Sequence, residues 1–377
     1  MGAIMKIGIE EEFITIDSSN LFYTPAAPKI LLSMLAKNGI YLSKSSLETP
    51  LGRHRFPKSF RELENGFTIV EIKTSPHRDI DSLKEEIIFH RKNLIDAASD
   101  NDISILPVGI HPFFSQDLCG IENCAALHIH VGDIKKKCYF NILKYVPHLI
   151  ALTANSPFVR GKFLAMCSRA LYSPSIGIPR NFYERTSDLI INNCLNTIEL
   201  RACDTQIFPD DVIGAAAVIE CLALLSESEK ISRSKYETQR KNAIYFGKEK
   251  LDTNVLFNKI SSSAEELGLT DYVTHFFTRM TGAEWQCRCL QKYNFSTLIE
   301  SLCDSMKTGN YKIKSSKNMP ESQVGISNNL YYLIPYLPIM AVNIIKKIRQ
   351  DDAVNTTTLF GRHPEKIESE LLFDNIE

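Results

Sequence analysis

The chain has 377 residues, 44% of them hydrophobic, and its 43 basic and 44 acidic side chains give a formal net charge of -1. This is the composition of an ordinary globular protein, with enough length for one large domain or two moderate ones. The near-zero charge excludes a global attraction to nucleic acid or to anionic membranes, so any anion-binding site has to be local.

Cysteine usage and apolar runs bear on the compartment. The 10 cysteines are scattered and form no CxxC pair, which argues against a zinc ribbon or a secreted disulfide framework and favours reduced thiols. The first residues show no basic segment followed by an apolar one, so a signal peptide is not expected. The most apolar run, residues 331–345, is interrupted by prolines and too short to cross a bilayer comfortably. We expect a cytoplasmic protein that binds neither membrane nor nucleic acid; a homodimer is left open.

Short β-type runs alternate with helical patterns along the first 226 residues. The helix expected at 82–99 opens on a capping-box spacing between Ser82 and Glu85, and the helix expected at 211–226 is apolar almost all round, so it should be buried. In chain order, the expected elements are a strand at 6–16, a strand at 67–74, a helix at 82–99, strands at 103–111 and 126–132, a helix at 139–154, a strand at 197–203 and a helix at 211–226.

The strands alternate apolar with polar residues, whereas parallel strands covered on both faces would be apolar throughout. This pattern predicts an α+β fold with a mainly antiparallel sheet, helices on one face and an open polar face. From about residue 307 the sequence becomes polar and rich in turn residues. We therefore expect a catalytic domain at 1–306 and a C-terminal extension of unknown role at 307–377.

Acids and histidines gather on the non-core face of this sheet. Side chains alternate along a strand, so residues two apart share a face, and Glu11 should point away from its neighbours into the structure. A lone strand glutamate is usually solvated, and a lone histidine is usually a structural residue. The informative feature is that four strands each place an acid or a histidine on the same face. The same-face pairs are Glu10 with Glu12, Glu71 with Lys73, His128 with His130, and Glu199 with Arg201.

Carboxylates gathered on one face repel one another unless a cation lies between them. Mostly oxygen ligands favour Mg²⁺ or Mn²⁺ over zinc, and Arg201 supplies a planar fork suited to a phosphate group. Alternatives are a solvated edge strand, for which Glu10 and Glu12 would merely be surface charges, and a metal-dependent amidohydrolase, in which an HxH pair also occurs. The amidohydrolase would require a different arrangement of histidines and a downstream lysine.

Eight motifs follow one another along the chain: GIEEEF, VEIKTSP, GIHPF, LHIHVG, LTANSPF, SRALYSPSIGIPRNF, TIELRACD and RKNAIYFG. In this order they resemble the motifs of the glutamate–cysteine ligase type 2 family, also called carboxylate–amine ligases. The resemblance covers about residues 6–306. It implies a fold similar to glutamine synthetase, with a curved antiparallel sheet whose open face holds ATP, divalent ions and the acyl substrate.

The resemblance also implies roles for individual residues. The implied metal ligands are Glu10, Glu12, Glu64, Glu71, His128 and Glu199; the implied nucleotide contacts are His128, His130, Arg169 and Arg201; and Arg201 and Glu12 are the implied catalytic residues. The implied cofactors are ATP and Mg²⁺, with Mn²⁺ as an alternative.

The implied reaction is an ATP-dependent ligation through an acyl phosphate, in which the γ-carboxylate of glutamate would be joined to the amine of cysteine or another amino acid. The other hypotheses are an ATP-dependent phosphotransferase and a non-catalytic nucleotide-binding protein on the same fold. The basic segment 52–60 and the residues after 307 are not typical of the family core, and no residue identifies a thiol-containing substrate.

Overall fold

The computed structural model describes residues 5–38, 41–42, 46–49, 52–55, 68–113, 124–132, 136–192, 195–226 and 230–314. Its centre is a nine-stranded sheet in which every strand pair is antiparallel, as the alternating patterns predict. The strand order is β10-β11-β7-β1-β5-β4-β3-β2, and β6 pairs with the C-terminal half of β1. The strands are β1 (Ile7–Asp17), β2 (Tyr41–Leu42), β3 (Ser46–Thr49), β4 (Gly52–Arg55), β5 (Ile69–Lys73), β6 (Ile103–Leu106), β7 (Ala126–Gly132), β10 (Leu189–Asn192) and β11 (Thr197–Asp204).

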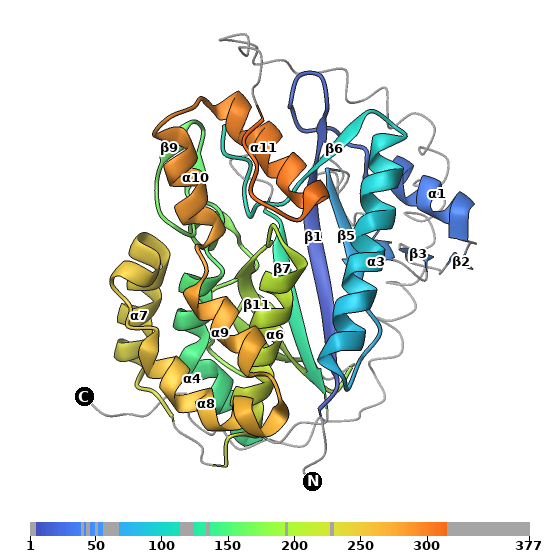
Figure 1. Cartoon of the computed structure of the whole chain (residues 1–377). Coiled ribbons are helices and arrows are strands. Elements are labelled where there is room, and N and C mark those ends of the chain that lie inside the picture. The colour runs from blue at the N-terminus through green and yellow to red at the C-terminus, as the bar shows by residue number, and fades with distance from the viewer. Residues whose placement is uncertain are drawn as a thin grey trace, which may run out of the picture.

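Helices cover one face of this sheet (Figure 1), so the fold is the predicted α+β arrangement. A small hairpin of β8 (Phe158–Val159) and β9 (Lys162–Phe163) stands apart from the sheet. The helices are α1 (Ala27–Asn38), α3 (Ile80–Ser99), α4 (Lys136–Leu152), α5 (Arg169–Tyr172), α6 (Pro209–Leu224), α7 (Arg233–Phe246), α8 (Asn254–Leu267), α9 (Thr270–Thr278), α10 (Gly282–Leu290) and α11 (Phe295–Thr308), with a 3₁₀ turn at Gly247–Glu249.

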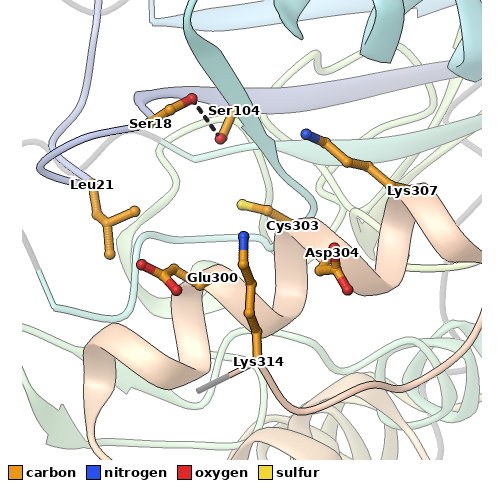
Figure 2. Close-up of a pocket in the computed structure, with 8 residues that line it drawn as sticks. All are labelled: Ser18, Leu21, Ser104, Glu300, Cys303, Asp304, Lys307 and Lys314. Atoms are coloured by element: carbon orange, nitrogen blue, oxygen red, sulfur yellow. Dashed lines mark hydrogen bonds between the residues drawn. The ribbon is translucent and has the colours of Figure 1, made fainter. Parts of the chain in front are cut away.

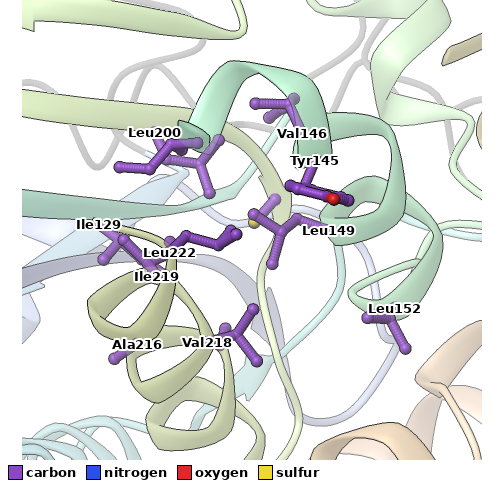
Figure 3. Close-up of a cluster of buried hydrophobic side chains, with 14 of the residues drawn as sticks. Ile129, Tyr145, Val146, Leu149, Leu152, Leu200, Ala216, Val218, Ile219 and Leu222 are labelled. Carbon is purple, nitrogen blue, oxygen red and sulfur yellow. The ribbon is translucent and has the colours of Figure 1, made fainter. Parts of the chain in front are cut away.

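The largest core cluster lies between the sheet and helices α4 and α6. Ile129 of β7 and Leu200 of β11 lie in this cluster with Leu149 of α4 and Ile219 of α6, all buried (Figure 3). Helix α6 is buried almost all round, as its apolar sequence predicts. Gly214 in this helix permits close approach to α9, because a Cβ atom there would lie 2.6 Å from Cβ of Phe276.

The start of helix α3 differs from the expectation. The helix begins at Ile80, and its N-cap is Asp79, whose carboxylate accepts a hydrogen bond of 2.8 Å from the backbone N–H of Ser82. The predicted capping box between Ser82 and Glu85 is therefore wrong, since Asp79 already fulfils the capping role one turn earlier. The expected helix at 139–154 corresponds to α4 and contains Pro147.

The strand expected at 103–111 ends early. Strand β6 stops at Leu106 because the following Pro107 has no backbone N–H to continue the ladder. His111 lies beyond it, fully buried, with its ring Nε2 3.0 Å from the carbonyl oxygen of Leu21. His111 is therefore a core residue and takes no part in the open face.

The expected domain boundary at 306/307 falls inside helix α11, which continues to Thr308. Beyond the helix, the ring of Tyr311 stacks on Trp285 with 4.8 Å between centroids, and the backbone N–H of Lys314 donates to Ser301 Oγ at 2.9 Å. Residues 307–314 therefore belong to the body of the domain. The rest of the expected extension, including the apolar run at 331–345, lies outside the described residues.

Two further sequence expectations concern the compartment. The cysteines within the described ranges are free thiols. Among the described helices, none combines the length and the apolarity needed to cross a membrane.

Candidate active site

The register of the central strands determines which side chains share the open face. Glu10 lies opposite His128 on β7, and His130 lies opposite Glu199 on β11. Directly opposed residues of an antiparallel pair project from the same face of the sheet. On the other side of β1, Glu12 lies opposite Glu71 of β5. The predicted shared polar face is therefore present in the described sheet.

Three of these side chains converge closely enough to share a cation. The candidate ligand atoms of Glu10, His130 and Glu199 all lie within 4.8 Å of one another. Glu10 Oε2 is also 3.5 Å from His128 Nδ1 and 3.6 Å from His130 Nε2. We refer to Glu10, His128, His130 and Glu199 as the acidic–histidine cluster.

The two carboxylates of this cluster are held in their charged form. Burial of the Glu10 carboxyl raises its pKa, but His128 and His130 act against burial and together hold the pKa well below its usual range. Burial likewise raises the pKa of Glu199, and the charges of Arg201 and of the two histidines lower it further than burial raises it. Both groups are thus negative at neutral pH, as cation ligands must be.

Arg201 stands beside this cluster on β11. One of its terminal nitrogens donates to Glu199 Oε1, and Asn192 Nδ2 donates to Glu199 Oε2 at 3.1 Å. The Nε atom of Arg201 is buried and has no hydrogen-bond partner among the described residues. The guanidinium therefore keeps donor capacity for an anionic group.

The donor set fits a divalent cation. The ring atoms His128 Nδ1 and His130 Nε2 are buried, and neither has a hydrogen-bond partner within the described part of the chain. Their distances to Glu10 Oε2, 3.5 and 3.6 Å, are too long for good hydrogen bonds. Two anionic carboxylates with a nearby imidazole nitrogen are ligands that Mg²⁺ or Mn²⁺ can use. His130, which was expected to contact only the nucleotide, is the histidine that completes the group with Glu10 and Glu199.

Glu11 occupies the opposite face of β1, as alternation predicts. Its side chain is 1% exposed and receives two hydrogen bonds from Arg91 of α3, of 3.0 Å from Nε and 2.5 Å from Nη2. Arg91 also donates to the backbone oxygens of Gln206 and Ile207, at 3.0 and 2.8 Å. Glu11 therefore anchors β1 to α3 beneath the site.

Arg169 does not lie on the open face. It is 1% exposed, and its Nε donates to Asp204 Oδ1 at 2.9 Å while its Nη2 donates to the backbone oxygens of Arg201 and Cys203. The expected nucleotide contact is not supported, because protein acceptors surround this guanidinium. The sequence motif around Arg169 could not distinguish a ligand contact from a buried structural one.

The remaining expected ligands differ in how far the structure describes them. Lys73 of β5 lies opposite Glu10 of β1, and Glu71 of β5 lies opposite Glu12, two residues further along β1. Glu64 lies outside the described residues. The structure thus brings together Glu10, His128, His130, Glu199 and Arg201, with Glu12 and Glu71 adjacent.

A separate pocket lies between the turn after β1, strand β6 and helix α11 (Figure 2). Its lining includes Ser18 and Ser104, which share a hydrogen bond of 2.9 Å, and Lys307 of α11. It contains none of the expected site residues, and its side chains carry charges of both signs. The open face of the sheet is the stronger candidate because titratable groups with lowered pKa values converge there.

Comparisons with known proteins show which proteins this chain resembles. No family model matches the chain. The chain is 23% identical over 361 residues to the glutamate–cysteine ligase of Haloquadratum walsbyi, covering 79% of this chain and 95% of that protein. It is 26% identical over 206 residues to a protein of Roseiflexus castenholzii whose name assigns it to glutamate–cysteine ligase 2, and this match spans 42% of the chain and only 54% of that protein.

A solved structure has a similar fold. The glutamate–cysteine ligase of Francisella tularensis, determined in complex with AMP, matches with a TM-score of 0.56 and 12% identity over 96% of this chain and 95% of that chain. The chain is therefore similar in sequence to proteins named glutamate–cysteine ligase, in agreement with its ordered motifs, and it shares its fold with a solved ligase of that name.

Proposed function

We propose that the protein is an ATP-dependent carboxylate–amine ligase. The observation that carries this proposal is the convergence of Glu10, His130 and Glu199, with Arg201 beside them, on the open face of an antiparallel sheet. The family resemblance of the motifs and the named ligase relatives support the same class of reaction. Glu10, His130 and Glu199 would hold a divalent cation, with Glu12 and Glu71 as further carboxylates of the same face.

The proposed reaction has two steps. A carboxylate oxygen of the first substrate attacks the γ-phosphorus of ATP, the bond from that phosphorus to the β–γ bridging oxygen breaks, and ADP leaves. The amine of the second substrate then attacks the acyl carbon, phosphate departs with the electron pair of the broken C–O bond, and the amine loses a proton. The products are an amide, ADP and phosphate.

The chain's contribution is positioning and charge stabilisation. Phosphoryl transfer places negative charge on the transferring oxygens, and preorganised donors lower its energy without reorganising. Arg201 would donate to these oxygens through nitrogens that Glu199 does not occupy. A bound divalent cation would supply charge neutralisation between the clustered carboxylates and the phosphate oxygens.

For the substrates, we propose the γ-carboxylate of glutamate and the amine of cysteine. This finer assignment rests on the family and on the names of relatives such as the Haloquadratum walsbyi ligase. We propose ATP with Mg²⁺ as the cofactors, and Mn²⁺ as a substitute of similar ligand preference.

A hydroxylamine trap tests the ligase proposal. Protein supplied with Mg²⁺, ATP and glutamate should form a hydroxamate when hydroxylamine replaces the amine, because hydroxylamine captures an acyl phosphate. ADP release should depend on the carboxylate. A stable phosphorylated product would indicate a phosphotransferase. Intact ATP binding without hydroxamate across a broad panel of carboxylates would refute the ligase proposal and leave nucleotide binding alone.

A further inference from the structure

Strand β11 carries an irregularity at the position of Arg201. Leu200 lies opposite Ile129, and Cys203 lies opposite Leu127, so three steps along β11 correspond to two steps along β7. Arg201 and Ala202 therefore form a β-bulge opposite the single residue His128. Bulges bend a strand and redirect its side chains, and they occur often beside active sites. The Arg201 side chain leaves β11 from this bulge and contacts Glu199 of the same strand.

A buried ion pair holds the bulge from one side. Arg169 donates through Nη2 to the backbone oxygens of Arg201 and Cys203, at 3.0 and 2.8 Å, so one guanidinium spans the bulge. Its Nε is fixed by Asp204 at 2.9 Å. Asp204 is fully buried and receives further hydrogen bonds from the backbone N–H of Asn155 and the hydroxyl of Ser156. These contacts leave Arg169 little freedom to move.

A second buried ion pair holds the bulge from the other side. The backbone N–H of Arg201 donates to the backbone oxygen of Asp188 at 2.9 Å. The Asp188 carboxylate is fully buried and receives two hydrogen bonds from Arg240 of α7, of 2.6 and 2.9 Å, and one of 2.8 Å from the Tyr236 hydroxyl. Helix α7 therefore fixes the segment that pairs with the Arg201 amide.

We propose that the two ion pairs Arg169–Asp204 and Arg240–Asp188, named here the bulge clamp, are positioning groups that aim Arg201 at the transferring phosphate. The inference rests on the proposed ligase function for the role of Arg201. The clamp binds the backbone N–H and C=O of the same residue, so the peptide planes on both sides of Arg201 are fixed. A guanidinium placed about 1 Å from its productive position can lose on the order of 10²-fold in rate.

Lysine variants separate this role from simple stabilisation. Arg169→Lys keeps the charge but has one nitrogen, which cannot replace both the Nε bond to Asp204 and the Nη2 bonds to the two carbonyl oxygens. Arg240→Lys cannot form the two parallel hydrogen bonds to the Asp188 carboxylate. We expect kcat to fall about tenfold in each folded variant, while KM for ATP changes by less than about threefold, because Arg201 acts mainly in the transferring state. The matched control is Arg233→Lys, which alters an exposed ion pair with Glu237 on the same helix α7. Its kcat should stay unchanged.

A double-mutant cycle tests whether the clamp acts through Arg201. Combining Arg169→Lys or Arg240→Lys with Arg201→Ala should give a kcat no lower than that of Arg201→Ala alone, because the group being positioned is already gone. The proposal would be overturned if the losses of kcat in the single variants multiplied in the double variants. A normal kcat in the folded single variants would also overturn it. Should Arg169→Lys fail to fold, Arg240→Lys and Tyr236→Phe carry the same comparison on the other side of the bulge.

Amide hydrogen exchange gives a readout that needs no turnover. Exchange at the Arg201 amide should be faster in Arg240→Lys than in the wild type and unchanged in Arg233→Lys, since that amide is bonded to the Asp188 backbone. Unchanged exchange in both variants would overturn the clamp. If the wild-type protein turns over no ATP, the proposed ligase function is refuted. The exchange measurement then still tests whether the bulge clamp holds the Arg201 backbone, because it needs no turnover.

Discussion

Replacing Glu11 by glutamine should destabilise the protein, whereas replacing the neighbouring Glu10 by glutamine should weaken cation binding. The two side chains leave β1 on opposite faces. Glu11 pairs with buried Arg91, and Glu10 faces the acidic–histidine cluster. One glutamine substitution therefore perturbs a buried ion pair, and the other perturbs the proposed metal site, at adjacent positions of one strand.

The size of the Glu11 effect follows from the contacts of Arg91. Removing one partner of a buried ion pair commonly costs about 3–5 kcal/mol. Arg91 keeps its two backbone acceptors at Gln206 and Ile207, and glutamine keeps one carbonyl oxygen, so the lower end of that range, about 3 kcal/mol, is expected. For a protein of this size this corresponds to a decrease in Tm of about 4 °C.

Thermal unfolding and calorimetric titration with Mg²⁺ measure the two effects separately. Glu11→Gln should lower Tm and leave the Mg²⁺ affinity unchanged, while Glu10→Gln should lower the Mg²⁺ affinity at least about tenfold, since even the loss of a supporting group costs that much in metal sites. A Glu11→Gln variant with normal Tm and weakened Mg²⁺ binding would mean that the register of β1 is shifted by one residue.

Three other outcomes are expected. Arg201→Lys should lower kcat by roughly 10²–10³ with a much smaller change in KM for ATP, and steady-state kinetics showing only a raised KM would contradict a transition-state role. Burial lowers the pKa of His111 from 6.5 to about 4, so the unfolded chain binds this proton more readily and the free energy of unfolding should fall as the pH decreases from about 6.5 to about 4. In denaturant titrations, the free energy of unfolding of His111→Gln should depend less steeply on pH over this range. An unchanged pH dependence would show that other groups cause it. A chain ending at residue 314 should have a higher Tm than one ending at 306, because only the longer chain keeps the end of α11 and the stacked Tyr311; equal Tm values would make residues 307–314 dispensable.

The open face could be predicted from sequence because period-two alternation is a local property. Glu10, His128 and Glu199 each lie two positions from another polar residue of the same strand, and pairing in register then brings the strands' polar sets together. The identity of the third convergent ligand could not be predicted. It depends on the registers of β7 with both of its neighbours, which set His128 opposite Glu10 and His130 opposite Glu199, while the ligand atoms that converge are those of Glu10, His130 and Glu199.

Other features depend on contacts that sequence patterns do not encode. The bulge at Arg201 reflects one extra residue in a strand, and the run TIELRACD gives no local signal of it. The family motif around Arg169 predicts a nucleotide contact. In the structure, its guanidinium instead pairs with the buried Asp204 carboxylate. Helices α7 to α11 were not predicted either, although the buried residues Leu256, Ile260 and Ala264 of α8 recur at helical spacing.

The position of β1 in the sheet has a consequence for how the site forms. This strand precedes the other described strands of the sheet in the chain, yet it lies between β7 and β5, and β11 pairs with β7 on the far side of β7 from β1. A hydrogen bond of 2.7 Å from the Thr205 hydroxyl to the backbone oxygen of Glu12 joins residues 193 apart in the chain. Contacts of such long separation require large loops to close and are slow to form. During synthesis, Glu10 and Glu12 are therefore made well before Glu199 and Arg201, which follow 189 positions later in the chain.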